Sequence, residues 1–204
     1  MKLERGCLGE IEFWHRPGFS DLKTFQEVIG RNAYQRRGMK IEPGEKWMDC
    51  GGNVGAFSLL ACHLGASVTT YEPDPYSCEL LSKNLDLNGY RADIRQAALV
   101  HNDWDKVTLF IGNNNNVWRN SIVRKWNSSG ITVPAVNFDI ESLQFDNCKM
   151  DIEGEEMPIL EQTKKVFHKL VYEWSFDIDP SLSRLWTLID RQKKLYRVNA
   201  SWSA

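Results

Sequence analysis

Short apolar runs alternate with segments of helical periodicity along most of the chain. The alternation predicts strands at 46–49, 67–72 and 92–100 and helices at 54–64 and 75–88. A strand followed by a helix and a further strand indicates parallel pairing through a crossover helix. We therefore predict an α/β fold, Rossmann-like and doubly wound, around a mostly parallel sheet.

The alternation is interrupted after residue 101 and resumes later in the chain. Strands predicted at 106–111 and 131–137 enclose a polar, asparagine-rich stretch, which we interpret as an inserted hairpin with a loop. The stretch is either a solvated surface loop or a cover over a substrate, and in the second case Trp118 and Asn120 are its candidate substrate contacts. The remaining pattern predicts strands at 148–152, 169–174 and 195–202 and helices at 155–163 and 182–192.

The residues ahead of the first parallel strand form an entry segment, residues 1–45. Within this segment, positions 21–34 predict a helix. A length of 204 residues with 42% hydrophobic content allows one core of useful size. We expect a single domain, in which the entry segment packs on a main unit that spans residues 46–204.

Charge and cysteine content disfavour several classes of protein. The chain has 25 lysines and arginines against 27 acidic residues, so its net charge of −2 gives no overall basic field for nucleic acid. Five widely spaced cysteines without a C-x-x-C pair argue against a disulfide framework and against a zinc site. Because no apolar stretch approaches the length of a membrane span and the first residues lack the apolar core of a signal peptide, we expect a cytoplasmic protein.

A glycine-rich turn follows the strand predicted at 46–49. Its glycines do not have the G-x-G-x-x-G spacing of a dinucleotide site, and no P-loop lysine follows. The layout suits S-adenosylmethionine, with Asp49 near the ammonium group and Glu72, at the end of the next strand, on the ribose hydroxyls. The predicted cofactor contacts are Asp49, Gly51, Gly52, Asn53, Gly55, Glu72, Pro73 and Ala97. The simpler alternative is a glycine turn of the kind found in any doubly wound sheet.

Carboxylates near the ends of the later strands are the candidates for acid–base chemistry. Methyl transfer to an alcohol needs alignment of the two reactants and a base for the hydroxyl proton. Asp151 and Glu173 are the predicted catalytic residues, and Glu153 is a predicted substrate contact. Glu156 fits better as a carboxylate at a helix N-terminus, where the helix dipole favours it.

Two alternatives stay open for these carboxylates. Glu173 could instead pair with an arginine of the entry segment, Arg16 or Arg36. No cluster of histidines and cysteines indicates a metal centre, and we predict no metal ligands, although Asp151 with Glu173 or Asp177 leaves a magnesium site conceivable.

Four motifs occur in order along the chain. They are His15-Arg16-Pro17-Gly18 with the stretch from Ser20 to Tyr34, the turn from Asp49 to Ser58, Tyr71 to Pro75 followed by Asn84 to Asn88, and Lys149 to Glu156. Together they resemble the FkbM-type S-adenosylmethionine-dependent methyltransferases over about residues 13–173. Cys50-Gly51-Gly52, Met150 and Glu155 depart from that family's usual residues. The resemblance implies the class I methyltransferase fold, S-adenosylmethionine as cofactor, and O-methylation of sugars or of natural-product hydroxyls.

The function favoured by these observations is O-methyl transfer to a hydroxyl of a sugar, a glycan or a similar polyhydroxylated small molecule. A nucleic-acid methyltransferase is an alternative that the charge disfavours. A non-catalytic nucleotide-binding Rossmann module of a larger glycan-processing protein is another, and it is disfavoured because Asp49, Glu72 and Asp151 occur together. We expect a sugar or glycan partner and no nucleic acid, while the oligomeric state stays open.

Overall fold

In the described part of the chain, five parallel strands form the sheet at the centre of the molecule. The computed structural model describes residues 2–36, 39–112, 119–125, 129–175, 178 and 180–195. The strand order in the sheet is β10 (Lys169–Tyr172), β9 (Asn147–Met150), β3 (Lys46–Cys50), β4 (Ser67–Tyr71) and β5 (Asp93–Arg95). The chain therefore builds the sheet outward from β3 in one direction and then from β9 in the other. This reversal places a topological switch point between β3 and β9, where ligands bind in open α/β sheets.

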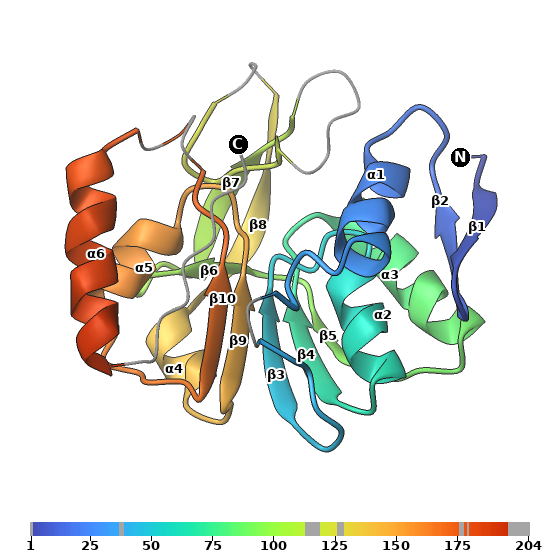
Figure 1. The fold of residues 1–204 in the computed structure, drawn as a ribbon. Coiled ribbons are helices and arrows are strands. Elements are labelled where there is room, and N and C mark those ends of the chain that lie inside the picture. Colours follow the sequence, from blue (N-terminus) through green and yellow to red (C-terminus); the bar gives the residue numbers. More distant parts are fainter. Residues whose placement is uncertain are drawn as a thin grey trace.

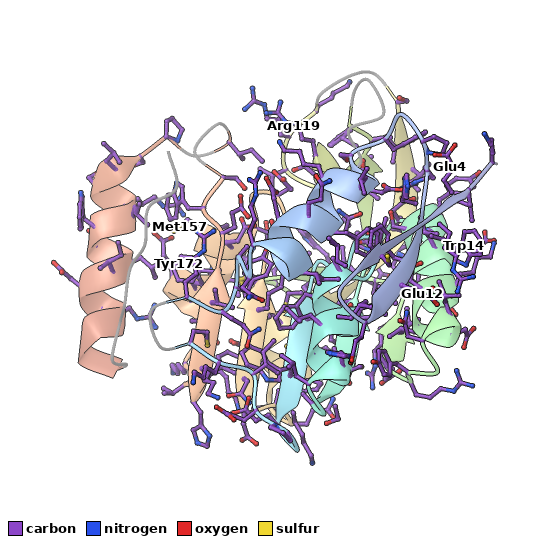
Figure 2. All side chains as sticks on the ribbon, turned by 45° about the vertical axis from the view of Figure 1, so that its right-hand side comes forward. Glu4, Glu12, Trp14, Arg119, Met157 and Tyr172 are labelled. Atoms are coloured by element: carbon purple, nitrogen blue, oxygen red, sulfur yellow. The ribbon has the colours of Figure 1, made fainter. Side chains whose placement is uncertain are left out.

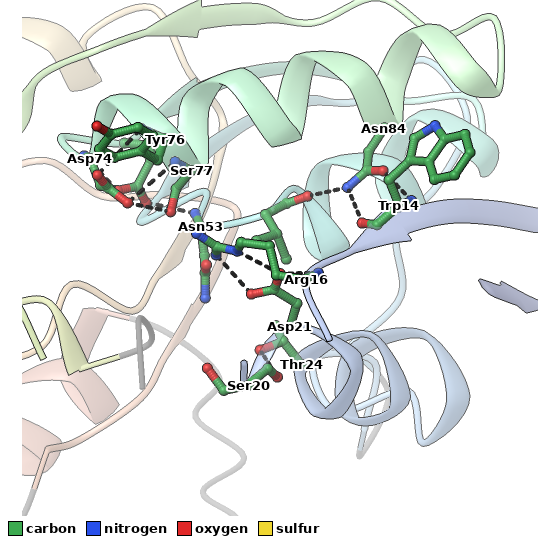
Figure 3. Close-up of polar contacts among 12 residues, drawn as sticks. Trp14, Arg16, Ser20, Asp21, Thr24, Asn53, Asp74, Tyr76, Ser77 and Asn84 are labelled. Atoms are coloured by element: carbon green, nitrogen blue, oxygen red, sulfur yellow. Dashed lines mark hydrogen bonds and ion pairs between the residues drawn. The ribbon is translucent and has the colours of Figure 1, made fainter. Parts of the chain in front are cut away.

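Helices cover both faces of the sheet, as the doubly wound prediction requires. Figure 1 shows α2 (Ala56–His63) and α3 (Pro75–Leu87) on one side, and α4 (Phe138–Ser142), α5 (Glu156–Gln162) and α6 (Leu182–Leu195) on the other. The helix α3 begins where the sequence predicted, because Asp74 accepts hydrogen bonds from the backbone N–H groups of Tyr76 and Ser77 (Figure 3). No helix in the described part of the chain is both long and apolar enough to cross a membrane.

The entry segment differs from its prediction. The helix expected at 21–34 is a short α1 (Asp21–Phe25) continued by a π-helical turn, η1 (Gln26–Gly30). The helix ends early because Gly30 weakens it and Asn32 adopts a left-handed backbone with φ 51°. A hairpin of β1 (Glu4–Leu8) and β2 (Ile11–His15), which the sequence did not predict, precedes α1.

Two asparagines of α3 attach this hairpin to the rest of the molecule. Asn84 accepts from the N–H of Trp14 at 2.6 Å and donates to the Trp14 carbonyl at 3.2 Å. Asn88 makes the same pair of bonds with Glu12, at 2.9 and 2.7 Å. Four residues of helix rise about 6 Å and two residues of strand about 6.6 Å, so the spacings match. Figure 2 shows Glu12 and Trp14 on the hairpin beside α3.

The stretch expected as one strand at 92–100 is two. Residues of β5 pair with β4, whereas β6 (Ala98–Val100) belongs to a second sheet with β8 (Gly130–Asn137) and β7 (Lys106–Phe110). The strand breaks because the N–H of Ala97 turns back to the carbonyl of Arg95, at 2.9 Å. The pairing of β7 with β8 is antiparallel, which agrees with the predicted inserted hairpin.

The predicted C-terminal strand at 195–202 falls mostly on residues 196–202, which lie outside the described part of the chain. Its first residue, Leu195, is the last residue of α6, so at that position the prediction was wrong.

Candidate active site

One pocket lies at the switch point and collects segments far apart in the sequence. It is bounded by the turn after β3, the end of β4, the β5–β6 connection, the inserted hairpin and the loop after β9. Its wall consists of Gly51, Asn53, Tyr71, Glu72, Pro73, Ala97, Ala98, Leu99, Leu109, Asn120, Ile122, Asp151, Ile152, Glu153 and Glu155. The predicted cofactor contacts Gly51, Asn53, Glu72, Pro73 and Ala97 and the predicted catalytic residue Asp151 are thus brought together.

The glycines of the turn are required by the packing of the protein itself. A Cβ on Gly51 would lie 1.9 Å from the backbone carbonyl oxygen of Asp151, and one on Gly52 would lie 2.2 Å from Oγ1 of Thr70. We expected these glycines to admit a ligand, but their first role is to let the turn pack against the loop after β9 and against β4. Gly52 and Gly55 are buried and are not part of the pocket wall.

Glu72 and Asn53 form the polar part of the wall at the end of β4. The carboxylate of Glu72 accepts from the N–H groups of Asn53 at 2.7 Å and Asp74 at 2.8 Å. Burial raises the pKa of Glu72 to about 7, although these hydrogen bonds act in the opposite direction. Asn53 has a left-handed backbone, and its buried Oδ1 has no hydrogen-bond partner. An orphaned polar atom beside a carboxylate is what a polar ligand would satisfy.

Asp49 lies beneath the turn rather than in the pocket wall. Its side chain is 0% exposed, and it accepts from Oγ of Ser58 at 2.7 Å and from Oγ1 of Thr70 at 3.3 Å. Its Oδ1 pairs with Nζ of Lys149 at 3.2 Å, and Lys149 also donates to the Gly51 carbonyl at 2.7 Å. The side chains of Asp49 and Lys149 thus support the turn from below, and direct contact of Asp49 with a cofactor stays a prediction.

Lys149 was not identified from the sequence. Burial alone would lower its pKa, but the negative charges of Asp49 and Asp151 outweigh that effect and hold its pKa above the usual value. A lysine within an apolar strand, two residues before an acidic strand end, was the available signal.

Asp151 begins the loop after β9 and faces the pocket. Its Oδ2 accepts a hydrogen bond of 2.8 Å from the hydroxyl of Tyr34, which belongs to the entry segment. Glu173, the other predicted catalytic residue, follows β10 and is not part of the pocket wall. The charge of Asp151, together with burial, raises the pKa of Glu173 to about 7. Glu173 and Asp151 are therefore close enough to influence each other.

The arginine pairing considered for Glu173 is not formed by Arg16. Nε of Arg16 donates to Oδ2 of Asp21 at 2.8 Å, and Nη2 donates to Oδ1 at 2.8 Å, within the entry segment (Figure 3). Among the described residues no ion pair joins Arg36 to Glu173. Groups of three or more potential metal ligands are not found in the described part of the chain, and Asp177 lies outside it.

The acidic loop after Asp151 is held by Glu156. The carboxylate of Glu156 accepts from the N–H groups of Ile152 and Gly154, both at 2.7 Å. Burial raises its pKa to about 7. Glu156 thus stabilises the loop near the start of α5, in line with the structural role expected for it.

The inserted hairpin contacts the same loop. Oγ of Ser121 donates to the carbonyl of Glu153 at 2.6 Å, and Asn120, a predicted substrate contact, lies in the pocket wall. Glu153, another predicted contact, also lies in the wall, with a left-handed backbone of φ 56°. The third predicted contact, Trp118, lies outside the described residues.

Glu155 is a pocket residue that the sequence reasoning missed. It is buried, and its Oε1 bonds Nδ1 and the backbone N–H of His101, the residue after β6. The pairing fixes the orientation of the loop against the second sheet.

The comparison with known protein families agrees with the family resemblance of the motifs. The family model for the methyltransferase FkbM domain matches residues 49–198. The chain belongs to the FkbM methyltransferase family. The cofactor of this family is S-adenosylmethionine, as the turn predicted. Glu72 on the pocket wall and the unpaired Oδ1 of Asn53 fit that molecule, because its ribose hydroxyls and ammonium group are hydrogen-bond donors.

Among individual relatives, the 31-O-demethyl-FK506 methyltransferase FkbM of Streptomyces tacrolimicus is 33% identical over 78 residues, which are 37% of this chain and 26% of that protein. The chain thus spans about a quarter of the length of this curated relative. A solved FkbM methyltransferase of Methylobacillus flagellatus aligns over 67% of this chain and 32% of its own, with 17% identity and a TM-score of 0.41. The tRNA (uracil-54, C5)-methyltransferase of Pyrococcus abyssi aligns over 79% and 31%, with 15% identity and a TM-score of 0.45.

Proposed function

We propose that this FkbM-family domain transfers a methyl group from S-adenosylmethionine to a hydroxyl of a sugar, a glycan or a similar polyhydroxylated small molecule. The observation that carries the proposal is that Asp151, a carboxylate suited to accept a proton, shares one pocket wall with the predicted cofactor contacts Glu72 and Asn53. Oxygen as the acceptor atom is supported by the relative that matches 37% of this chain, whose name specifies a 31-O-demethyl substrate.

The residues of the pocket have separate tasks in this reaction. S-adenosylmethionine supplies the methyl group as an electrophile on a cationic sulfur. Glu72 accepts hydrogen bonds from ribose hydroxyls, and the amide of Asn53 binds a polar group beside it. The carboxylate of Asp151 accepts the proton of the acceptor hydroxyl as that oxygen forms its new bond to carbon. The apolar wall from Ala97 to Leu99 excludes water.

The charge of the pocket wall selects the acceptor. Among the wall residues that the structure describes, the ionisable side chains other than Tyr71 are all carboxylates, namely Glu72, Asp151, Glu153 and Glu155, with no lysine or arginine. Carboxylates at short range repel phosphate and carboxylate groups, whereas neutral hydroxyls donate to them. Arg119, which lies in the insertion between β7 and β8, is not part of the pocket wall, and Figure 2 shows it at the edge of the molecule. We infer an uncharged polyol rather than a nucleic acid.

The test is methyl incorporation from labelled S-adenosylmethionine into a panel of neutral glycosides, each paired with its phosphate monoester, and into RNA and DNA at several salt concentrations. We expect incorporation into neutral glycosides and much less into their phosphorylated partners. The variant Asp151→Asn keeps the shape but removes the base, so turnover should fall roughly 10²-fold or more while cofactor affinity changes only a few-fold. Activity confined to nucleic acids or to phosphorylated acceptors would overturn the proposal.

A further inference from the structure

Tyr34 brings the entry segment into contact with the acidic loop of the pocket. Its hydroxyl donates to Oδ2 of Asp151 at 2.8 Å, across a separation of 117 residues. Its ring packs edge-on against Phe57 of α2, with the centroids 5.8 Å apart and an interplanar angle of 83°. Nζ of Lys149 lies 5.5 Å from the centre of the same ring. The hydroxyl of Tyr34 is thus held by packing on two sides of its ring.

We propose that Tyr34 is the positioning residue for Asp151, fixing one carboxylate oxygen so that the other faces the acceptor hydroxyl. This inference rests on the proposed function of Asp151 as proton acceptor. Within the described part of the chain, the carboxylate of Asp151 accepts a hydrogen bond through Oδ2 alone. A carboxylate with one oxygen fixed presents the other in a defined direction, which proton transfer requires.

Tyr34 is suited to this task because its hydroxyl stays protonated and so remains a hydrogen-bond donor. Burial, followed by the charges of Asp151 and Glu173, raises its pKa well above the usual value for tyrosine. A neutral donor stabilises the charged form of Asp151 without neutralising it, whereas an arginine at this place would pair with the carboxylate and weaken it as a base.

The surroundings of Asp151 are crowded with charge, which makes one neutral donor important. The groups that influence Asp151 and Tyr34 come from four elements and one loop: Asp49 on β3, Lys149 on β9, Glu156 on α5, Glu173 after β10, and Glu27 on η1 through its effect on Glu173. One of these groups is a cation, and four are carboxylates. Loss of the Tyr34 hydrogen bond therefore leaves Asp151 among like charges, with Lys149 as its remaining partner of opposite charge in this group.

A purely structural role would also fit the contact, because it ties the entry segment to the main unit. The two roles differ in what Tyr34→Phe changes. This variant keeps the ring between Phe57 and Lys149 and removes only the hydroxyl. If the contact is purely structural, Tyr34→Phe changes the stability of the protein alone. If Tyr34 positions Asp151, the variant also changes the protonation of Asp151 and the turnover.

The first measurement is the carboxyl titration of Asp151 by ¹³C NMR, with the resonance assigned from its absence in Asp151→Asn. We expect Tyr34→Phe to move the titration midpoint upward by about half a pH unit to one unit, because a donor to the charged form is lost. Tyr90→Phe is the matched control, since the Tyr90 hydroxyl bonds Nδ1 of His63 at 2.9 Å and neither residue is part of the pocket wall. An unchanged midpoint in Tyr34→Phe would overturn the inference, whatever its effect on the melting temperature.

The second measurement is turnover on the acceptor that the glycoside panel identifies. We expect kcat of Tyr34→Phe to fall roughly tenfold with KM for S-adenosylmethionine unchanged, and the acidic limb of the pH–rate profile to move to higher pH. Equal kcat in Tyr34→Phe and Tyr90→Phe would contradict the positioning role. If the panel yields no acceptor, the proposed function fails, and the NMR titration still decides whether Tyr34 controls the Asp151 carboxylate.

Discussion

At the scale of single residues, we expect cofactor binding to depend most on the side chain of Glu72, which lies in the pocket wall. Both of its oxygens already accept backbone N–H groups, so the carboxylate is fixed before a ligand arrives. We expect Glu72→Ala to weaken S-adenosylmethionine binding by about 1.5–3 kcal/mol, the cost typical of lost charge-assisted hydrogen bonds. Isothermal titration calorimetry measures this, with Glu79→Ala, an exposed glutamate of α3, as the control. An affinity that Glu72→Ala leaves unchanged would remove Glu72 from the cofactor site.

At the scale of single residues, the sequence predicts pocket residues that directly follow a predicted strand. Glu72 and Asp151 were predicted in this way, because the carboxyl ends of parallel strands meet at one edge of the sheet. Lys149 and Tyr34 were not, because each acts through a partner distant in sequence, and no local spacing encodes such a pair. The burial of Asp49 beneath the turn has the same origin, since Lys149 comes from a later strand.

At the scale of elements, the hairpin β1–β2 depends on the two asparagines of α3. The side chain of Asn84 is 0% exposed and hydrogen-bonds both the backbone N–H and the backbone carbonyl of Trp14. It also donates to the carbonyl of Val54 at 2.9 Å. We expect Asn84→Ala to lower the free energy of unfolding by about 2–3 kcal/mol, because it leaves buried backbone groups without partners. Urea unfolding measures the loss, and amide hydrogen exchange at Trp14 shows whether the hairpin opens first.

Lys83→Ala provides the control on the same helix, because the side chain of Lys83 is exposed and pairs with Glu79 on the helix surface. A loss of stability equal in Asn84→Ala and Lys83→Ala, or unchanged exchange at Trp14, would show that the asparagine does not hold the hairpin.

Most parallel strands and helices were predictable because their periodicity is local. The hairpin was missed although Ile11 and Phe13 alternate with less buried neighbours, which is a strand pattern. The break between β5 and β6 was not predictable from the sequence. The two strands form one continuous stretch in the sequence pattern, but β5 pairs with the central sheet and β6 with the second sheet, and this pairing is set by tertiary contacts.

At the scale of the whole molecule, the net charge of −2 conceals an uneven distribution. Carboxylates gather in the pocket wall and beside it: Glu72 is buried in the wall, Glu156 is buried against the loop after β9, and burial raises the pKa of each to about 7. Whole-chain charge could therefore argue against a basic surface, but it could not reveal that the cavity is acidic. That property arises from folding, which brings the ends of several strands together.

These buried carboxyls make the stability of the protein depend on pH in a definite direction. Between pH 4.5 and 7 the folded state keeps protons on Glu72 and Glu156 that the unfolded chain has released. The folded state then binds more protons, so the free energy of unfolding falls as the pH rises through this range. Because one pKa unit corresponds to about 1.4 kcal/mol, each group contributes a decrease on the order of a few kcal/mol.

The variant Glu156→Gln isolates one of these contributions. Its uncharged amide cannot titrate, so we expect the decrease in stability between pH 4.5 and 7 to be smaller in Glu156→Gln than in the wild type, whatever its stability at a single pH. Urea unfolding at a series of pH values gives both curves, and Glu79→Gln, at an exposed position on α3, is the matched control that should keep the wild-type slope. Parallel curves for wild type and Glu156→Gln would mean that Glu156 gives up its proton near the usual pH of a glutamate and that the loop after β9 is charged throughout this range.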